Sequence, residues 1–283
     1  MTTTHTLDVP GARLYYEVRG SGPLLLVMGA PMDAGAFAPL ADALASDHTV
    51  VTHDPRGISG STLDDPEQDS TPELRADDVA ALLDALGAET ADVFGSSDGA
   101  VTGLALVARH PGRVGTLIAH EPPVTELLPD AAEQRAATED IILTFHREGQ
   151  PAAWRKFMAN AGFDQPSDQG SGEGEADGIG RAEAAAPPVF APSPRDIANG
   201  VRFFAHELRA TTAHIPDIAA LKAAPTRTVV GIGAASGALV TYRTSMALAE
   251  RLAVRPVEFP GDHGGFLGQP VEFAEVVRRV LKG

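Results

Sequence analysis

Runs of apolar residues alternate with amphipathic segments along the first part of the chain. "PLLLVMG" (23–29) is continuously apolar, which is typical of a strand buried on both faces of a parallel sheet. In "TPELRADDVAALLDALGA" (71–88), Thr71 is placed as an N-cap, Pro72 follows in the first turn, and apolar residues recur at helical spacing up to Gly87. This alternation predicts right-handed βαβ units and an α/β fold with a doubly wound, mostly parallel sheet.

The pattern changes after Pro123. Residues 124–222 contain helical stretches but no convincing strand, and the alternation of strand and helix resumes beyond them. We therefore predict one core, made of residues 1–123 and 223–283, that is interrupted by a helical cap at 124–222.

Part of this cap has a composition of its own. Residues from about 164 to 196 are rich in Gly, Ser, Pro and acidic side chains. Such a composition buries little apolar surface, so it predicts a flexible loop rather than a folded element.

The charge and composition narrow the classes of partner and chemistry. The formal net charge is −16, and an acidic surface repels nucleic acids and anionic membranes, so we predict neither as a partner. The chain has no cysteine, which excludes disulfides, thiolate metal sites and a cysteine nucleophile.

The sequence also bears on location. The first residues, "MTTTHTLDVP", have neither the basic nor the apolar segment of a secretory signal. The longest apolar run, "PLLLVMGAPM", is too short to span a bilayer. We therefore expect a cytoplasmic protein.

"GSSDG" (95–99) stands between an apolar strand and a helix, which is the context of a G-x-S-x-G nucleophile elbow. The central residue of such a turn has a strained backbone, and the residues two before and two after it pack against each other. Side chains at those two positions must therefore be minimal. Gly95 and Gly99 meet this requirement around Ser97.

Two neighbouring residues are alternative nucleophiles. Ser96 would be flanked by Phe94 and Asp98, which are too large. Asp98 would be flanked by Ser96 and Ala100, which are small enough, and would imply chemistry like that of dehalogenases or epoxide hydrolases. The two-glycine register favours Ser97 over Asp98. An ordinary glycine-rich turn without chemistry is the simplest alternative.

Several motifs together resemble those of one superfamily. "MGAPMD", "DPRGISGST", "GSSDGA", "ARHPGRVGTLIAHEPP" and "PGDHGGF" occur in the order expected of a capped α/β-hydrolase with a serine nucleophile, and the resemblance covers nearly the whole chain. It implies that Ser97 is the nucleophile and that His263, in the loop before the last helix, is the general base. It also implies that the reaction needs no metal and no organic cofactor.

The resemblance extends to the oxyanion hole. Met28 stands where the superfamily often has a histidine, but the donors of this turn are backbone N–H groups, which the change leaves intact. The resemblance implies that these donors are the N–H groups of Ala30 and Asp98, and that Gly29 permits the turn.

The triad acid departs from the common pattern. It usually follows the strand that corresponds to "RTVVGIG", but residues 234–243 contain no Asp or Glu. The superfamily has an alternative position after the strand that follows the nucleophile helix, and Glu121 stands there, before Pro122. A carboxylate at that strand end lies on the same sheet edge as Ser97, so we predict that Glu121 orients His263.

Other interpretations of the acid remain open. Glu121 would have no catalytic part if it simply began the insert and pointed to solvent. Ser97 and His263 would then form a dyad, with Ser236 in the vacated place. Asp262 is adjacent to His263 in sequence, which makes an interaction between their side chains awkward.

These residues favour a hydrolase that cleaves an ester, lactone or thioester of a small organic molecule through an acyl-enzyme. One alternative is a non-hydrolytic enzyme of the same fold, such as a lyase, cyclase or perhydrolase. Another is a ligand-binding protein with little turnover. The sequence leaves a homodimer open.

Apolar side chains are candidates for the substrate pocket. Their alternative role is to form the small core of the cap itself. The candidates are Met28, Trp154, Phe157, Phe203 and Phe204.

Overall fold

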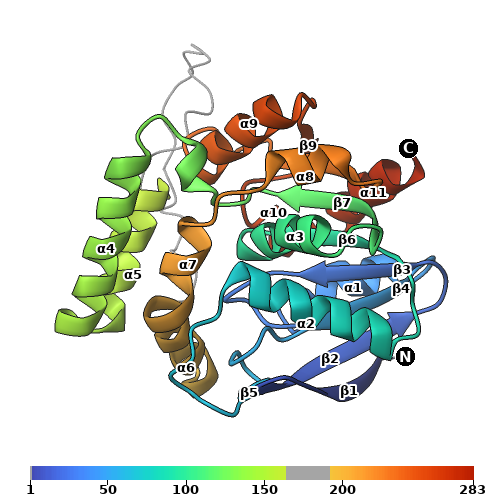
Figure 1. Cartoon of the computed structure of the whole chain (residues 1–283), viewed down its shortest axis with the longest axis horizontal. Coiled ribbons are helices and arrows are strands. Elements are labelled where there is room, and N and C mark those ends of the chain that lie inside the picture. The colour runs from blue at the N-terminus through green and yellow to red at the C-terminus, as the bar shows by residue number, and fades with distance from the viewer. Residues whose placement is uncertain (1, 164–191) are drawn as a thin grey trace, which may run out of the picture.

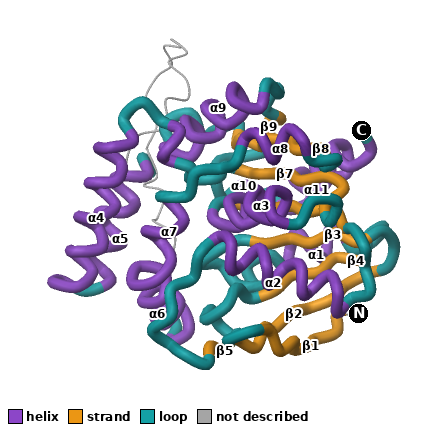
Figure 2. The backbone as a smooth tube through the Cα atoms, viewed as in Figure 1, coloured by secondary structure: helices purple, strands orange, loops and turns teal. Residues whose placement is uncertain are grey.

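The computed structural model describes residues 2–163 and 192–283. One twisted sheet, flanked by helices on both faces, forms its centre (Figures 1 and 2). The spatial order of its strands is β1 (Thr2–Val9), β2 (Ala12–Gly20), β4 (Thr49–His53), β3 (Leu24–Met28), β6 (Ala91–Ser96), β7 (Val114–His120), β8 (Arg227–Gly233) and β9 (Val257–Phe259), and the short β5 (Thr62–Leu63) pairs with β2.

The strands from β4 to β9 are parallel, whereas β1, β2 and β5 pair antiparallel at one edge. The central strands are almost fully buried, as their continuous apolar runs predict. The predicted fold class, a doubly wound and mostly parallel sheet, is therefore confirmed.

Helices pack on the two faces of the sheet and close two apolar clusters. On one face lie α2 (Pro72–Ala85), α3 (Asp98–Arg109), α8 (Ile218–Ala223) and α9 (Val240–Leu252). On the other face lie α1 (Ala38–Leu44), α10 (Gly265–Gly268) and α11 (Pro270–Lys282). As predicted, the Thr71 hydroxyl caps α2 and Pro72 stands in its first turn.

The insert between β7 and β8 is helical among its described residues, and its long helices lie to one side of the sheet (Figure 1). Its elements are η1 (Thr125–Leu127), α4 (Ala131–Glu148), α5 (Gln150–Ala161), α6 (Pro194–Arg202), the π-helix η2 (Phe203–Glu207), α7 (Leu208–Thr212) and α8. The insert has an apolar cluster of its own, which includes Ile141, Phe203 and Phe204. The division into a core and a cap domain stays a prediction.

Most of the loop predicted at about 164–196 lies outside the described residues. Its last residues do not fit the prediction, because α6 begins at Pro194. There the Ser193 hydroxyl accepts from the Asp196 N–H, and the Asp196 carboxylate accepts from the Ser193 N–H, which forms a capping box. This local capping outweighs the loop-like composition.

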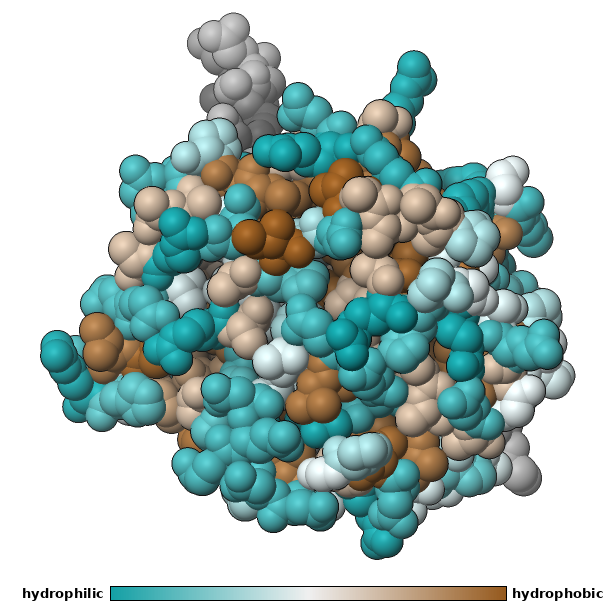
Figure 3. Space-filling view, viewed as in Figure 1, coloured by the Kyte–Doolittle hydropathy of each residue, from teal (hydrophilic) through white to brown (hydrophobic). Residues whose placement is uncertain are grey.

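The apolar surface and the helix lengths are the features that would mark a membrane segment. On the face in Figure 3, apolar side chains occur in small groups separated by polar ones. No helix among residues 2–163 and 192–283 is both long enough and apolar enough to cross a bilayer.

The register of the parallel strands decides where the functional residues meet. Met28 pairs with Gly95, Ser96 pairs with His120, and His120 pairs with Gly231. The segments that follow these positions therefore leave the sheet side by side at its carboxyl edge. In doubly wound sheets this edge is where ligands bind.

Candidate active site

Ser97 forms the sharp turn between β6 and α3. Its φ of 56° and ψ of −123° lie far from the usual regions, whereas neither Ser96 nor Asp98 has a positive φ. A Cβ on Gly95 would lie 2.5 Å from the carbonyl oxygen of Gly99. The two glycines thus pack against each other as the steric argument requires, and the turn is centred on Ser97.

The three polar side chains of this turn have different surroundings. The Ser96 hydroxyl is buried and lies 3.0 Å from Nδ1 of His120. The Asp98 carboxylate is also buried, and its Oδ1 accepts from Nη2 of Arg75 at 2.5 Å. Ser97 alone of the three is partly exposed. It is therefore the side chain of this turn that a substrate can reach.

Glu121 follows β7 directly and turns its side chain into the protein. Its φ is 49°, and its N–H donates to the Gly231 carbonyl at 3.1 Å. The side chain is 0% exposed, and its Oε2 lies 2.6 Å from Nδ1 of His263. The structure thus brings Glu121 and His263 together, and it excludes a solvent-pointing Glu121.

Two further groups hold the Glu121 carboxylate, and neither was foreseen from the sequence. The Gly233 N–H donates to Oε1 at 2.8 Å, and the Thr241 hydroxyl donates to Oε2 at 3.0 Å. Gly233 ends β8, the strand after which the superfamily usually has its acid. The signal for Thr241 was a hydroxyl in a segment without acids, whereas a backbone donor such as Gly233 leaves no signal in the sequence.

The surroundings of Glu121 keep it ionised. Burial alone would raise the pKa of Glu121, but the hydrogen bond from His263 and the nearby His120 and His263 imidazoles outweigh burial and lower it to about 2. A carboxylate that stays charged throughout the physiological range fixes the His263 tautomer with its proton on Nδ1. Nε2 of His263 is then free to accept a proton.

His120 links the turn at Ser97 to His263. Its carbonyl accepts from the Ser97 N–H at 2.9 Å, and its ring stacks on the His263 ring with 6.1 Å between centroids. Burial lowers the pKa of His120 to about 4, so this ring is neutral. It therefore supports the His263 ring without adding a positive charge beside it.

The candidate nucleophile Ser97 and the candidate base His263 have no hydrogen bond between them in the described part of the chain. This bond is frequently long in enzymes without substrate and tightens in the reactive complex.

The two expected oxyanion donors are free. Neither the Ala30 N–H nor the Asp98 N–H has an acceptor within residues 2–163 and 192–283. Asp98 is the first residue of α3, where backbone N–H groups have no partner within the helix. At Gly29, a Cβ would lie 2.6 Å from the Phe37 ring, so the turn before Ala30 needs a glycine.

Comparison with known proteins places the chain in a family. The model of a family described as the alpha/beta hydrolase fold matches residues 22–153. The uncharacterised hydrolase YraK of Bacillus subtilis is 34% identical over 284 aligned residues, which cover 98% of this chain and 95% of that protein. The chain belongs to the α/β-hydrolase family. Its relatives are named as hydrolases, and it is an α/β-fold hydrolase.

Two further comparisons agree with this assignment. A zearalenone hydrolase of Cladophialophora bantiana is 38% identical over 121 residues, which are 41% of this chain and 46% of that protein. The structure of a thermophilic esterase from Thermogutta terrifontis aligns with a TM-score of 0.71 at 20% identity, over 100% of this chain and 98% of that one. The latter likeness shows the fold.

The residues predicted to line the substrate pocket of this α/β-hydrolase lie in different surroundings. Phe203 and Phe204 lie in the apolar cluster of the insert and are almost fully buried, and Phe157 packs against that cluster. Trp154 also packs there but borders a pocket of about 230 Å³ between the insert and the segment after Ala30. Met28 is buried and lines a small cavity together with Gly29 and Ala30.

One aromatic residue beside the site was missed. Phe163 follows α5, is 39% exposed, and places its ring 6.2 Å from that of His263 between centroids. It was missed because the composition of its neighbourhood indicates a loop.

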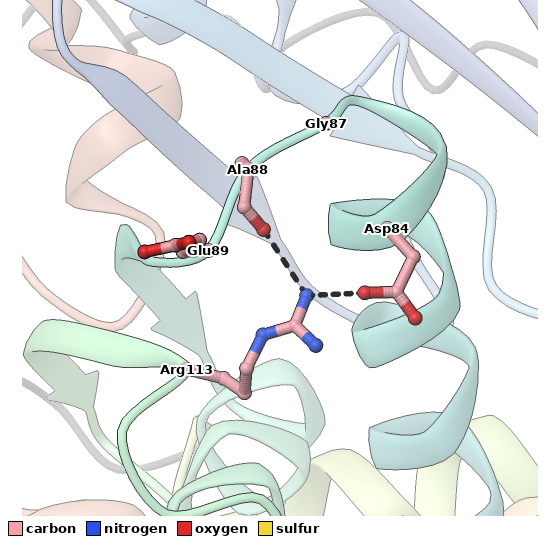
Figure 4. Close-up of a pocket in the computed structure, with 5 residues that line it drawn as sticks. All are labelled: Asp84, Gly87, Ala88, Glu89 and Arg113. Atoms are coloured by element: carbon pink, nitrogen blue, oxygen red, sulfur yellow. Dashed lines mark hydrogen bonds and ion pairs between the residues drawn. The ribbon is translucent and has the colours of Figure 1, made fainter.

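Another hollow lies at the opposite edge of the sheet (Figure 4). It is lined by Asp84, the segment 87–89 and Arg113, and Nη2 of Arg113 donates to Asp84 Oδ1 at 2.7 Å and to the Ala88 carbonyl at 3.2 Å. These residues precede β6 and β7, whereas Ser97 and Glu121 follow them. This hollow is therefore separate from the candidate active site.

Proposed function

We propose that this α/β-hydrolase is a serine hydrolase that cleaves an ester, lactone or thioester of a small organic molecule through an acyl-enzyme. The observation that carries the proposal is the buried hydrogen bond of 2.6 Å between His263 and Glu121. It lies at the sheet edge where Ser97 forms the turn between β6 and α3.

In the first half of the reaction, Nε2 of His263 takes the proton of the Ser97 hydroxyl, and Ser97 Oγ attacks the carbonyl carbon of the substrate. The imidazolium that forms is stabilised by the Glu121 carboxylate. The N–H groups of Ala30 and Asp98 receive the negative charge that develops on the carbonyl oxygen. His263 then gives its proton to the leaving alcohol or thiol, which leaves Ser97 acylated.

In the second half, a water molecule replaces the leaving group. His263 takes a proton from this water, and the hydroxide attacks the acyl carbon through a second tetrahedral intermediate. The same two N–H groups stabilise it. His263 returns its proton to Ser97 Oγ, and the carboxylic acid product departs.

The contact of Glu121 with His263 bears on two alternatives, a non-hydrolytic reaction and a Ser-His dyad without an acid. A base without an acid partner would favour a non-hydrolytic reaction, and the contact between Glu121 and His263 therefore supports hydrolysis. The dyad alternative has no acid, with Ser236 in the vacated place. Ser236 is fully buried, and the His263 Nδ1 partner at the shortest distance is Glu121.

The helical insert supplies the substrate pocket in this proposal. The pocket of about 230 Å³ lies next to the segment after Ala30, and helices α5 and α6 contribute Trp154 and Asn199 to its wall. Its size fits a small organic group.

A covalent probe tests the proposal. We expect a fluorophosphonate to label the wild-type protein and not Ser97→Ala, and nitrophenyl esters to be hydrolysed only by the wild type. Ser46→Ala is the matched control, because Ser46 is exposed and lies on the segment between α1 and β4. Equal labelling of wild type and Ser97→Ala, or no labelling of the wild type, would refute the proposal.

A further inference from the structure

The proposed mechanism uses the N–H of Asp98 and has no part for its side chain. Yet the Asp98 carboxylate is only 2% exposed and pairs with Arg75, whose side chain is 4% exposed. Burying an ion pair costs desolvation energy that its own attraction hardly offsets. Stability alone is therefore a poor reason for a charged pair directly behind the nucleophile.

Arg75 connects α3, which begins at Asp98, with two other segments. Its Nε donates to the Thr102 hydroxyl of α3 at 3.1 Å, and its Nη1 donates to the Ser70 carbonyl at 3.3 Å. Its Nη2, which holds Asp98, also donates to the Thr211 hydroxyl at 3.0 Å. A guanidinium group is planar and rigid, so contacts on its different nitrogens are fixed relative to one another.

Thr211 makes this cluster a link between the core and the insert. It lies on α7 of the insert and is 2% exposed. A second contact joins the same two parts nearby, because the Ser70 N–H donates to the His206 carbonyl at 3.0 Å. The position of α7 is thereby transmitted to Arg75, and through Arg75 to the Asp98 side chain.

Glu207 of the insert also interacts electrostatically with Arg75 and Asp98. It is not, however, the hydrogen-bond partner of Arg75. Glu207 is 1% exposed, and neither carboxyl oxygen has a hydrogen-bond partner within the described residues. Nε of Arg202 lies 3.9 Å from its Oε1. Asp98 is thus the acid that receives the Arg75 hydrogen bond.

We propose that Arg75 is a positioning residue of the hydrolytic site. It holds the Asp98 carboxylate, and with it the Asp98 N–H that receives the oxyanion, in a geometry set by helix α7 through Thr211. The inference rests on the proposed function. Its physical basis is that Asp98 follows the strained Ser97, so a fixed Asp98 side chain also fixes the peptide plane that carries its N–H.

Loss of these contacts should weaken the stabilisation of the transition state and leave substrate binding nearly unchanged. Removal of one oxyanion donor typically lowers kcat by 10²–10³, so a misdirected donor should lower it by roughly tenfold or more. A trifluoromethyl ketone adds to the nucleophilic serine and forms a hemiketal oxyanion on the same N–H groups. Its affinity should fall in parallel with kcat.

The sharpest variant is Thr211→Val, which removes the hydroxyl and keeps the shape, with Thr211→Ser as the matched control. We expect Thr211→Val to lower kcat about tenfold, to raise the Ki of the ketone by a similar factor, and to change KM little. Thr211→Ser should behave like the wild type. Arg75→Lys, which keeps the charge and loses the planar contacts, should show the same split more strongly.

Three results would overturn the inference while Ser97→Ala remains inactive. The first is a folded Thr211→Val and a folded Arg75→Lys with kcat and Ki within about twofold of wild type. The second is an effect on KM alone, which would indicate that the cluster shapes the pocket. The third is an equal effect in Thr211→Ser. If Ser97→Ala instead keeps its activity, the proposed function itself fails.

Discussion

Nδ1 of His263 lies 2.6 Å from Oε2 of Glu121, although 142 positions separate the two residues in the chain. The sheet brings them together, because Glu121 follows β7 and His263 follows β9, and both strands end at the same edge. The Glu121 side chain then reaches the end of β8, where the Gly233 N–H donates to it at 2.8 Å.

Glu121→Gln tests the acid directly. The amide is nearly isosteric, but it cannot stabilise the imidazolium and favours the wrong His263 tautomer, so we expect kcat to fall by about 10²–10⁴. Steady-state hydrolysis of a nitrophenyl ester measures this. Glu89→Gln, at an exposed residue, is the control. Activity of Glu121→Gln within about twofold of wild type would show that His263 needs no acid.

Thr241→Val tests the second donor to the same carboxylate oxygen. The Thr241 hydroxyl lies 3.0 Å from Glu121 Oε2, and a hydrogen bond to a charged group contributes about 1.5–3 kcal/mol. Without it the carboxylate is less well fixed, and we expect kcat to fall by about tenfold. Thr241→Ser keeps the hydroxyl and should retain most of the activity. Equal kcat values for the two variants would show that the Thr241 hydroxyl does not help to fix the Glu121 carboxylate.

Gly99→Ala tests the packing of the elbow. A Cβ at this position would lie 2.3 Å from the Met28 carbonyl oxygen, whereas a Cβ at Gly268 meets nothing within 4 Å. We expect Gly99→Ala to lower the free energy of unfolding by several kcal/mol, as overpacked sites with backbone shifts do. Gly268→Ala should leave it within about 1 kcal/mol. Urea denaturation compares them, and equal stability of the two variants would contradict the packing.

Glu207→Gln tests how the buried Glu207 carboxyl makes the free energy of unfolding depend on pH. Burial raises the pKa of Glu207 from 4.5 to about 7. The unfolded chain therefore loses this proton at lower pH than the folded protein. The contribution of Glu207 to the free energy of unfolding should therefore fall as the pH rises from about 4.5 to about 7, by up to roughly 3 kcal/mol. The Gln variant lacks this fall.

The comparison of the two proteins isolates the Glu207 contribution, because all other titrating groups are shared. Urea denaturation at pH 5 and at pH 8 should therefore show that Glu207→Gln gains on the wild type between the two pH values. A stability difference between the two proteins that is the same at both pH values would show that Glu207 does not titrate in this range.

The strands and helices of the core could be predicted because their signals are local. The apolar run of β3 and the cap, proline and spacing of α2 depend on neighbouring residues alone. The π-helix η2 left no such signal, because it widens a helix whose pattern already reads as helical. The predicted loop ran past the start of α6, because a capping box depends on two side chains and not on composition.

The site was predictable to the extent that backbone geometry dictates residue type. Gly95 and Gly99 select Ser97 by size, and the absence of acids after β8 directs attention to Glu121. Contacts between distant segments could not be foreseen. The bonds from Gly233 and Thr241 to Glu121, and the pairing of Arg75 with Asp98, depend on strand order and helix placement, which a local pattern does not encode.

The central claim is that Ser97 carries the acyl group during turnover. The most direct measurement is to quench the wild-type protein with acid during hydrolysis of a nitrophenyl ester and to locate the acyl group by peptide mass spectrometry. We predict a single acyl group, on Ser97, in the wild type and none in Ser97→Ala. An acyl group on Ser96, or one that persists in Ser97→Ala, would contradict the account.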